Sequence, residues 1–198
     1  MINGSIHEAL GVLRNGGVIL YPTDTIWGIG CDATDPAAVD RIFRIKNRPD
    51  SKSLVLLASD LDMITRYVKA IPEMALDLVE VNDKPMTIIY PDAVAGTADK
   101  SDKRLLAYNA VAADGSVGIR IPLMPELCDM IRRFGRPIVS TSANVSGEPS
   151  PKRFADIPEG IRAAVDYIVD PALEASSTGL ASQIIKLSLS GEFQIIRM

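Results

Sequence analysis

Short apolar runs alternate along the chain with segments whose apolar residues recur every three or four positions. Short apolar runs bounded by Gly, Pro or polar residues are typical of buried strands, and the longer periodic segments are typical of amphipathic helices. The predicted strands are Val18–Tyr21, Leu54–Leu57, Thr87–Tyr90, Ser116–Pro122, Pro137–Ser142, Tyr167–Asp170, Gln183–Leu187 and Phe193–Arg197.

Capping residues mark the ends of the predicted helices. Ser5, followed three residues later by a glutamate, forms a capping-box signature and predicts a first helix from about Ile6 to Asn15. Asp35 before Pro36 predicts an N-cap and a first-turn proline for a helix that continues to residue 47. Further helices are predicted at 60–68, 72–81, 125–134 and 158–165, and Gly135 is expected to close the helix at 125–134.

This alternation predicts an α/β fold with a twisted mixed sheet flanked by helices. The length of 198 residues and the hydrophobic content of 47% suit one domain with a sizeable core, so residues 1–198 are expected to form a single domain. The least regular segment, Asp92–Ala113, is predicted to be a mobile loop region. No apolar run approaches the roughly 18 residues needed to span a bilayer, and no signal peptide is recognisable, so a cytoplasmic protein without membrane contact is expected.

Composition narrows the chemistry. The formal net charge of -4 and pI near 5.1 argue against a surface coated in positive charge for nucleic acid, although a local basic groove is compatible with them. The one histidine, His7, lies in the first predicted helix, where it is expected to be a solvated surface residue. Cys31 and Cys128 have no metal-ligand spacing, so free thiols and no transition metal are expected.

Two polar segments follow the first predicted strand and the second predicted helix. Tyr21–Asp32 places hydroxyls at a strand end, where α/β sheets bind ligands; a Thr/Asp turn with packing glycines is the alternative. Lys46, Arg48 and Lys52 fall together at a helix end, where the helix dipole alone would favour cations. Pro49 turns the chain there, which lets the three cations converge on a polyanion such as a triphosphate. Since they lie outside the apolar stripe, changing Lys46 or Arg48 to Ala is expected to leave the fold intact.

Two more polar segments come later in the chain. Arg120 interrupts an apolar strand; exposure at a sheet edge would explain it, but arginine near a cleft suits a bidentate grip on carboxylate or phosphate. Ser140, Ser142 and Asn144 share one face of an extended chain and can bind phosphate or ribose, with an Asx or Ser/Thr turn as the alternative. Since no glycine-rich phosphate loop is present, side chains would have to hold a nucleotide.

Four segments, taken in their order and spacing, closely resemble the YrdC/Sua5 family of threonylcarbamoyl-adenylate synthases: YPTDTIWGIGCD, RIFRIKNRPDSKSL, GIRIP and STSANVSGEPSP. The resemblance extends from about Gly17 to Ser150, with weaker similarity as far as Arg197. The resemblance implies a short, single-domain YrdC-like fold with a concave substrate cleft. It also implies a nucleotidyltransferase that takes L-threonine, bicarbonate or CO2, and ATP with Mg2+, and releases pyrophosphate and threonylcarbamoyl-AMP. Partner proteins would use this product to modify the adenosine next to the anticodon of ANN-decoding tRNAs.

The resemblance also implies roles for individual residues, with Mg2+ held through the ATP phosphates. The catalytic positions, which also bind ATP, are Lys46, Arg48, Ser142 and Asn144. Further ATP-binding positions are Lys52, Ser116, Ser140, Ser150 and Arg197. The threonine-binding positions are Thr23 and Arg120, and Ser182 is a weaker match.

The chain departs from the family pattern in two places, and two alternatives stay open. Ser53 stands where Pro or Gly is usual, and DKPMT (Asp83–Thr87) replaces a Pro-Gly-Pro-x-Thr segment, which affects the pocket wall near Lys84. One alternative is a paralogous branch of unassigned activity, which the intact K-x-R and S-x-N motifs disfavour. The other is a double-stranded RNA or tRNA binding factor without synthase activity, against which the acidic pI and the aromatic content of 5% weigh.

Overall fold

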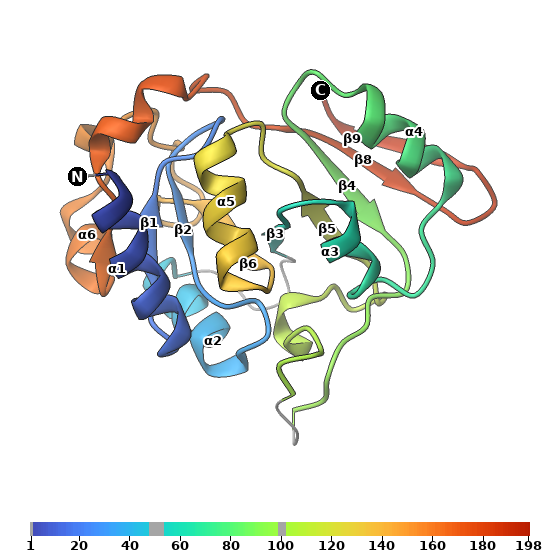
Figure 1. The fold of residues 1–198 in the computed structure, drawn as a ribbon, viewed down its shortest axis with the longest axis horizontal. Helices are drawn as coiled ribbons and strands as arrows, with labels where there is room; N and C mark the ends of the chain where they lie inside the picture. The colour runs from blue at the N-terminus through green and yellow to red at the C-terminus, as the bar shows by residue number, and fades with distance from the viewer. Residues whose placement is uncertain (1, 48–53, 99–101) are drawn as a thin grey trace.

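The computed structural model describes residues 2–47, 54–98 and 102–198. It contains a nine-stranded sheet with helices packed against it (Figure 1). The strands are β1 (Ile19–Tyr21), β2 (Gly28–Gly30), β3 (Val55–Leu57), β4 (Met86–Tyr90), β5 (Val117–Arg120), β6 (Ile138–Ser142), β7 (Tyr167–Ile168), β8 (Gln183–Leu187) and β9 (Phe193–Arg197). The α-helices are α1 (Ile2–Arg14), α2 (Pro36–Ile45), α3 (Leu61–Thr65), α4 (Glu73–Val81), α5 (Pro125–Phe134) and α6 (Glu159–Ala164). The 3-10 helices are η1 (Tyr108–Ala110), η2 (Phe154–Asp156) and η3 (Pro171–Ser176).

The strand order is β7-β1-β2-β6-β3-β5-β4-β8-β9. The pairs β1/β7, β3/β5 and β4/β8 are parallel and the other neighbours are antiparallel, so the predicted α/β fold with a mixed sheet is confirmed. Helices α1 and α5 lie side by side in front of the sheet, where Arg14 Nη2 donates to the carbonyl of Arg133 at 3.0 Å (Figure 1).

Helix ends follow the predicted capping chemistry at α2 and α5. The Asp35 carboxylate accepts hydrogen bonds from the amides of Ala37 and Ala38, at 3.1 and 3.2 Å, and Pro36 occupies the first turn. Gly135 ends α5 in the left-handed conformation with φ of 84°, which a residue with a Cβ adopts only with strain.

The N-terminal helix differs from the prediction. Helix α1 begins at Ile2, so Ser5 lies inside the helix and does not cap it. Its Oγ instead accepts hydrogen bonds from the amide of Asp170, at 2.9 Å, and from the hydroxyl of Tyr167, at 3.1 Å. A tertiary contact with the end of β7 therefore explains Ser5, and the local capping-box reading was wrong.

The segment after β1 contains a strand that was not predicted, although the packing role suggested for its glycines is confirmed. Gly28–Gly30 forms strand β2, which pairs with β1 and β6. The ring of Tyr21 packs against both glycines, and its hydroxyl donates to the carbonyl of Val139 at 3.0 Å. Burial raises the pKa of Tyr21 above its usual range, so this hydroxyl remains a donor. Small residues are needed here because a tyrosine lies across the sheet.

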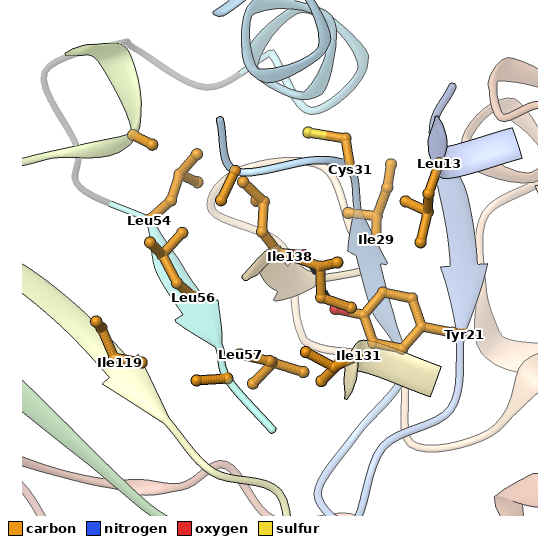
Figure 2. Close-up of a cluster of buried hydrophobic side chains, with 14 of the residues drawn as sticks. Leu13, Tyr21, Ile29, Cys31, Leu54, Leu56, Leu57, Ile119, Ile131 and Ile138 are labelled. Atoms are coloured by element: carbon orange, nitrogen blue, oxygen red, sulfur yellow. Dashed lines mark hydrogen bonds between the residues drawn. The ribbon is translucent and has the colours of Figure 1, made fainter. Parts of the chain in front are cut away.

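The buried core contains side chains from the helices and from the strands of the sheet. Figure 2 shows the side chains at its centre. The labelled members are Leu13, Tyr21, Ile29, Cys31, Leu54, Leu56, Leu57, Ile119, Ile131 and Ile138. They come from α1, α5 and the central strands, so the helices are fixed to the sheet by burial of apolar surface.

Strand β4 shows how the two faces of the sheet differ. Its residues Met86, Ile88 and Tyr90 face helices α3 and α4. Thr87 and Ile89 point to the opposite face. Since successive side chains of a strand alternate between faces, the sheet has an apolar face under the helices and a second face for polar residues.

We predict that Gly30→Ala destabilises the protein by about 1–3 kcal/mol, because overpacking in a close-packed core has this cost. A Cβ at Gly30 would lie 2.0 Å from the carbonyl oxygen of Val139 and 2.9 Å from the Tyr21 ring. Gly160→Ala in α6 is the matched control, since a Cβ there meets nothing within 4 Å. It is expected to be neutral or stabilising. Urea unfolding of both variants measures the difference, and equal stabilities would contradict the packing argument.

Candidate functional site

A cavity of about 740 Å³ lies on the polar face of the sheet. Its walls come from strands β2, β3, β4, β5, β6, β8 and β9 and from loops beside them, including the segment between β1 and β2. Eight of the residues singled out in the sequence line it, and they are Thr23, Ser116, Arg120, Ser140, Ser142, Ser150, Ser182 and Arg197. Residues far apart in the chain thus meet around one space.

Two further predicted site residues, Lys46 and Asn144, do not line this cavity. Lys46 and Asn144 are buried behind Ser142, which lines the cavity. Arg48 and Lys52 fall outside the described residues. His7 is exposed on α1, as expected, and both cysteines are free thiols, Cys31 buried and Cys128 half-buried.

Arg120 forms a buried ion pair at the cavity wall. Its Nη1 lies 2.6 Å from Asp24 Oδ1, and the two side chains are only 4% and 7% exposed. The other oxygen of Asp24 accepts from the amide of Leu123 at 3.1 Å, and Arg120 Nη2 donates to Thr25 Oγ1 at 3.3 Å. Strand β5 lies between β3 and β4, so exposure at a sheet edge does not explain this arginine. Asp24 instead fixes the guanidinium in place and compensates its charge.

The segment after β1 is held rigidly beside this pair. Thr23 Oγ1 and Thr25 Oγ1 are 2.7 Å apart, and Thr23 Oγ1 donates to the carbonyl of Ile26 at 2.8 Å. The segment before β8 runs alongside, with the amides of Thr178 and Gly179 bonded to the carbonyls of Asp24 and Thr25 at 3.0 and 2.7 Å. Thr23 is thereby fixed in the cavity wall.

The ammonium group of Lys46 binds the loop that follows β6. Its Nζ donates to the carbonyl of Ser142, to the carbonyl of Asn144 at 2.6 Å and to Asn144 Oδ1 at 3.2 Å. A lysine ammonium has three donors, which matches these three acceptors. Lys46 is only 1% exposed, so its removal is expected to lower stability, which the position of Lys46 outside the apolar stripe did not indicate. The helix pattern could not show this, since the acceptors lie almost a hundred residues further along the chain.

Ser142 and Asn144 complete this loop. The Ser142 hydroxyl donates to Asn144 Oδ1, and Asn144 Nδ2 donates to the carbonyl of Glu148 at 2.5 Å. Because the only proton of Ser142 is used in this way, the lone pairs of its oxygen remain for a cation or a donor group in the cavity.

A β-bulge on the edge strand β9 shapes the far wall. Ile184 pairs with Arg197 and Ile185 with Ile195, so Ile196 is an extra residue, and both Ile196 and Arg197 line the cavity. Arg197 Nε donates to the carbonyl of Ser182 at 2.9 Å. Burial lowers the pKa of Arg197, because it penalises the charged form.

The sequence reading missed two charged residues of the lining, Asp114 and Lys186. Lys186 Nζ lies 2.7 Å from Asp114 Oδ2, and Asp114 Oδ1 accepts from the hydroxyl of Ser116 at 2.6 Å. Lys186 interrupts the apolar strand β8 as Arg120 interrupts β5, so the same signal would have identified it. The departure at DKPMT leaves Thr87 buried in the cavity wall and Lys84 exposed.

Fold and site define a known class of α/β domain. The Sua5/YciO/YrdC family, whose model is described as "Telomere recombination", matches residues 11–198. The chain belongs to this family, as the resemblance predicted.

Two relatives illustrate the similarity in sequence. The threonylcarbamoyl-AMP synthase of Stenotrophomonas maltophilia (strain K279a) is 32% identical over 191 residues, covering 94% of this chain and 95% of the relative. The threonylcarbamoyl-AMP synthase of Hahella chejuensis (strain KCTC 2396) is 30% identical over 173 residues, covering 87% of this chain and 89% of the relative.

Two solved structures illustrate the similarity in fold. P. abyssi Sua5 in complex with L-threonine superimposes with a TM-score of 0.76 at 29% identity, covering 92% of this chain. This chain spans 50% of the length of that Sua5 chain. E. coli YciO superimposes with a TM-score of 0.72 at 27% identity, covering 97% of this chain and 87% of the other.

We predict that Lys46→Met destabilises the protein by about 1–3 kcal/mol, because buried acceptors in the loop after β6 lose their donor. Methionine keeps an unbranched apolar stem, so the loss reports on the ammonium group. Lys69→Met, at an exposed lysine, is the control and should change stability by less than about 0.5 kcal/mol. Urea unfolding tests this, and a Lys46→Met protein as stable as the control would contradict the role assigned to the ammonium.

We predict that Arg120→Met costs about 3–5 kcal/mol, because it leaves the buried carboxylate of Asp24 without its counter-charge. Combining it with Asp24→Asn should recover a large part of the loss, since the pair is then removed together. The four proteins of this double-mutant cycle are compared by urea unfolding. Losses that simply add would mean that the two charges do not compensate each other.

Proposed function

We propose that this chain is an L-threonylcarbamoyladenylate synthase, a nucleotidyltransferase that converts L-threonine, bicarbonate or CO2, and ATP into threonylcarbamoyl-AMP and pyrophosphate. Curated relatives that bear this name align with nearly the whole of this chain and over nearly the whole of their own length, which supports the proposal. The P. abyssi Sua5 chain that resembles this fold was solved with L-threonine.

The observation that carries the proposal is the meeting of distant polar segments around one cavity. Thr23 follows β1, Arg120 ends β5, and Ser142 ends β6, and all three line the same space. The convergence of polar groups from separate strands in one pocket is typical of a small-molecule site.

Threonine is assigned to the wall formed by Arg120 and Thr23. The guanidinium has five N–H donors in a planar fork, and the bonds to Asp24 and Thr25 use two of them, which leaves donors for a carboxylate. Thr23 would contact the threonine side chain or the carbamate. Since Asp24 already balances the charge of Arg120, orientation rather than net attraction would dominate recognition of the amino acid.

The reaction needs positioning and charge stabilisation more than a strong base. Addition of threonine's amine to CO2, with loss of a proton, gives a carbamate anion. Its oxygen attacks the α-phosphorus of ATP, the bond to the bridging oxygen breaks, and pyrophosphate leaves with the bonding electrons. A chain with one histidine, exposed on α1, is compatible with such chemistry because the nucleophile is already anionic.

ATP is assigned to the remaining polar lining. Lys46, Arg48 and Lys52 would surround the triphosphate, and Ser140, Ser150 and Arg197 would help to hold the nucleotide. Lys46 would have to exchange at least one of its loop acceptors for a phosphate oxygen, because all three of its donors are engaged. This exchange would couple nucleotide binding to the loop after β6.

Mg2+ is expected to enter with the ATP phosphates. Oxygen donors are the ligands it prefers, and the lone pairs of Ser142 beside Asn144 fit that preference. Among residues 2–47, 54–98 and 102–198, no group of three or more His, Cys, Asp or Glu side chains is placed to hold a metal ion.

The product would pass to partner proteins that modify the adenosine next to the anticodon of ANN-decoding tRNAs, in the cytoplasm. The names of the relatives do not favour the alternative of an RNA-binding factor without synthase activity. None of the helices that the structure describes is long and apolar enough to cross a membrane.

We predict that pyrophosphate release requires ATP, L-threonine and bicarbonate together, and that omission of any one abolishes it. Arg120→Lys should weaken threonine binding on the order of 10–100-fold with nearly unchanged ATP affinity, since lysine lacks the two-point grip. Arg133→Lys, at an exposed arginine of α5, is the control. Calorimetry with each substrate, beside a melting curve, makes the comparison. Release independent of threonine, or salt-dependent RNA binding without turnover, would reject the synthase.

A further inference from the structure

Three polar side chains form a connected cluster at the end of the cavity opposite Arg120. Ser116 precedes β5, Asp114 lies in the turn before it, and Lys186 belongs to β8; all three line the cavity. Lys186 is the pairing partner of Ile89 in β4, and Ile89 is the pairing partner of Gly118 in β5. The ion pair between Lys186 and Asp114 therefore passes over β4 on the cavity side.

The hydrogen bonds of this cluster fix the direction of the Ser116 hydroxyl. Asp114 Oδ1 accepts from Ser116 Oγ at 2.6 Å and from the Ser116 amide at 3.0 Å. A serine hydroxyl has one proton and two lone pairs, and a carboxylate can only accept. The proton of Ser116 therefore points at Asp114, and its lone pairs are left for the cavity.

Lys186 maintains this arrangement. Its ammonium lies 2.7 Å from the second oxygen of Asp114. The hydrogen bond from Lys186, followed by those from Ser116, lowers the pKa of Asp114. The contact with Lys186 also holds the carboxylate with its other oxygen toward Ser116. The pair is 40% and 55% exposed, and ion pairs this accessible contribute only about 0–1 kcal/mol to stability. Its main effect is on the hydroxyl beside it.

A neutral or anionic group that meets Ser116 in the cavity must therefore be a hydrogen-bond donor, since only a cation such as Mg2+ could use these lone pairs without donating a proton. Phosphate oxygens and carboxylates have none at neutral pH, so they are excluded as partners. Threonine is too short to supply the donor while its carboxylate is held at Arg120. Four residues of β5 separate the two positions, a span of about 13 Å at the rise of an extended strand. The remaining donors of the proposed substrates are the ribose hydroxyls and the base amine of ATP.

We propose that Ser116, with its proton held by Asp114 and Asp114 held by Lys186, accepts a hydrogen bond from the nucleoside part of ATP and not from its phosphates. This rests on the proposed function and specifies which part of the nucleotide occupies this end of the cavity. Ser116 is the residue in contact with ligand, and Asp114 and Lys186 are positioning residues that act through it.

The test compares ATP with analogues that each lack one donor. Calorimetry on the full chain uses ATP, 2′-deoxy-ATP, 3′-deoxy-ATP and purine riboside triphosphate, which lacks the base amine. At least one analogue should bind the wild type about 3–10-fold more weakly than ATP, as expected for one hydrogen bond. In Ser116→Ala the affinity ratio, which is the dissociation constant of that analogue divided by the dissociation constant of ATP, should fall to about one. Equal affinities in the wild type, or an unchanged ratio in Ser116→Ala, would overturn the proposal.

The positioning role is tested with the same ratio. Asp114→Asn gives the hydroxyl a neighbour that can donate, so the ratio should fall; Lys186→Met should lower it and Lys186→Arg should retain it. Lys69→Met and Ser190→Ala, both at exposed positions away from the cavity lining, are the matched controls. A ratio that stays at the wild-type value in both Asp114→Asn and Lys186→Met would refute the role of the pair.

Pyrophosphate release by the wild type separates this inference from the proposed function. Threonine-dependent release with equal affinity for every analogue contradicts only the assignment of Ser116. If the protein binds ATP more tightly than an analogue but shows no threonine-dependent pyrophosphate release, the proposed synthase activity is contradicted. The assignment of the nucleoside site is then still supported.

Discussion

The alternation of side chains across strands β4, β5 and β8 is the constraint on which the rest of the structure depends. One set of positions, such as Ile88 and Ile119, is buried toward the helices, and the other, such as Thr87 and Arg120, faces the cavity. A strand that shifted by one residue would exchange the two sets, so the apolar core fixes the register of the polar wall. Stability and site geometry are consequently set by the same pairing.

Buried charges in and behind the cavity wall also fix the geometry of the site. Arg120 is balanced by Asp24, and the Lys46 ammonium is satisfied by backbone carbonyls and an amide oxygen. Removing a charge from water is costly unless partners replace the solvent, so these side chains are confined to narrow geometries. The protein thus has preorganised donors and acceptors around the cavity, which is the property that a reaction driven by positioning requires.

The sequence predicted the strands and helices well where periodicity and capping agree, as at Asp35 and Gly135. It failed where a tertiary partner decides: Ser5 bonds to the end of β7, and Gly28–Gly30 pairs with β1 and β6 as a strand. The candidate site was found as a set of residue types, and most of those described do line one cavity. The hydrogen bond from Ser116 to Asp114 is local, but the ion pair between Asp114 and Lys186 of β8 could not be predicted from local pattern.

The extra residue in β9 has a consequence for how such a site can diversify. Ile196 shifts the alternation of the edge strand, so the side chain that follows it is turned toward the cavity. Deleting Ile196 would restore regular pairing and keep Arg197 opposite Ile184 on the cavity face, but it would remove one of the two adjacent side chains that this wall presents to the cavity. An edge hairpin of this kind allows the chemistry of one wall to change by insertion or deletion, a route that the paired central strands do not permit.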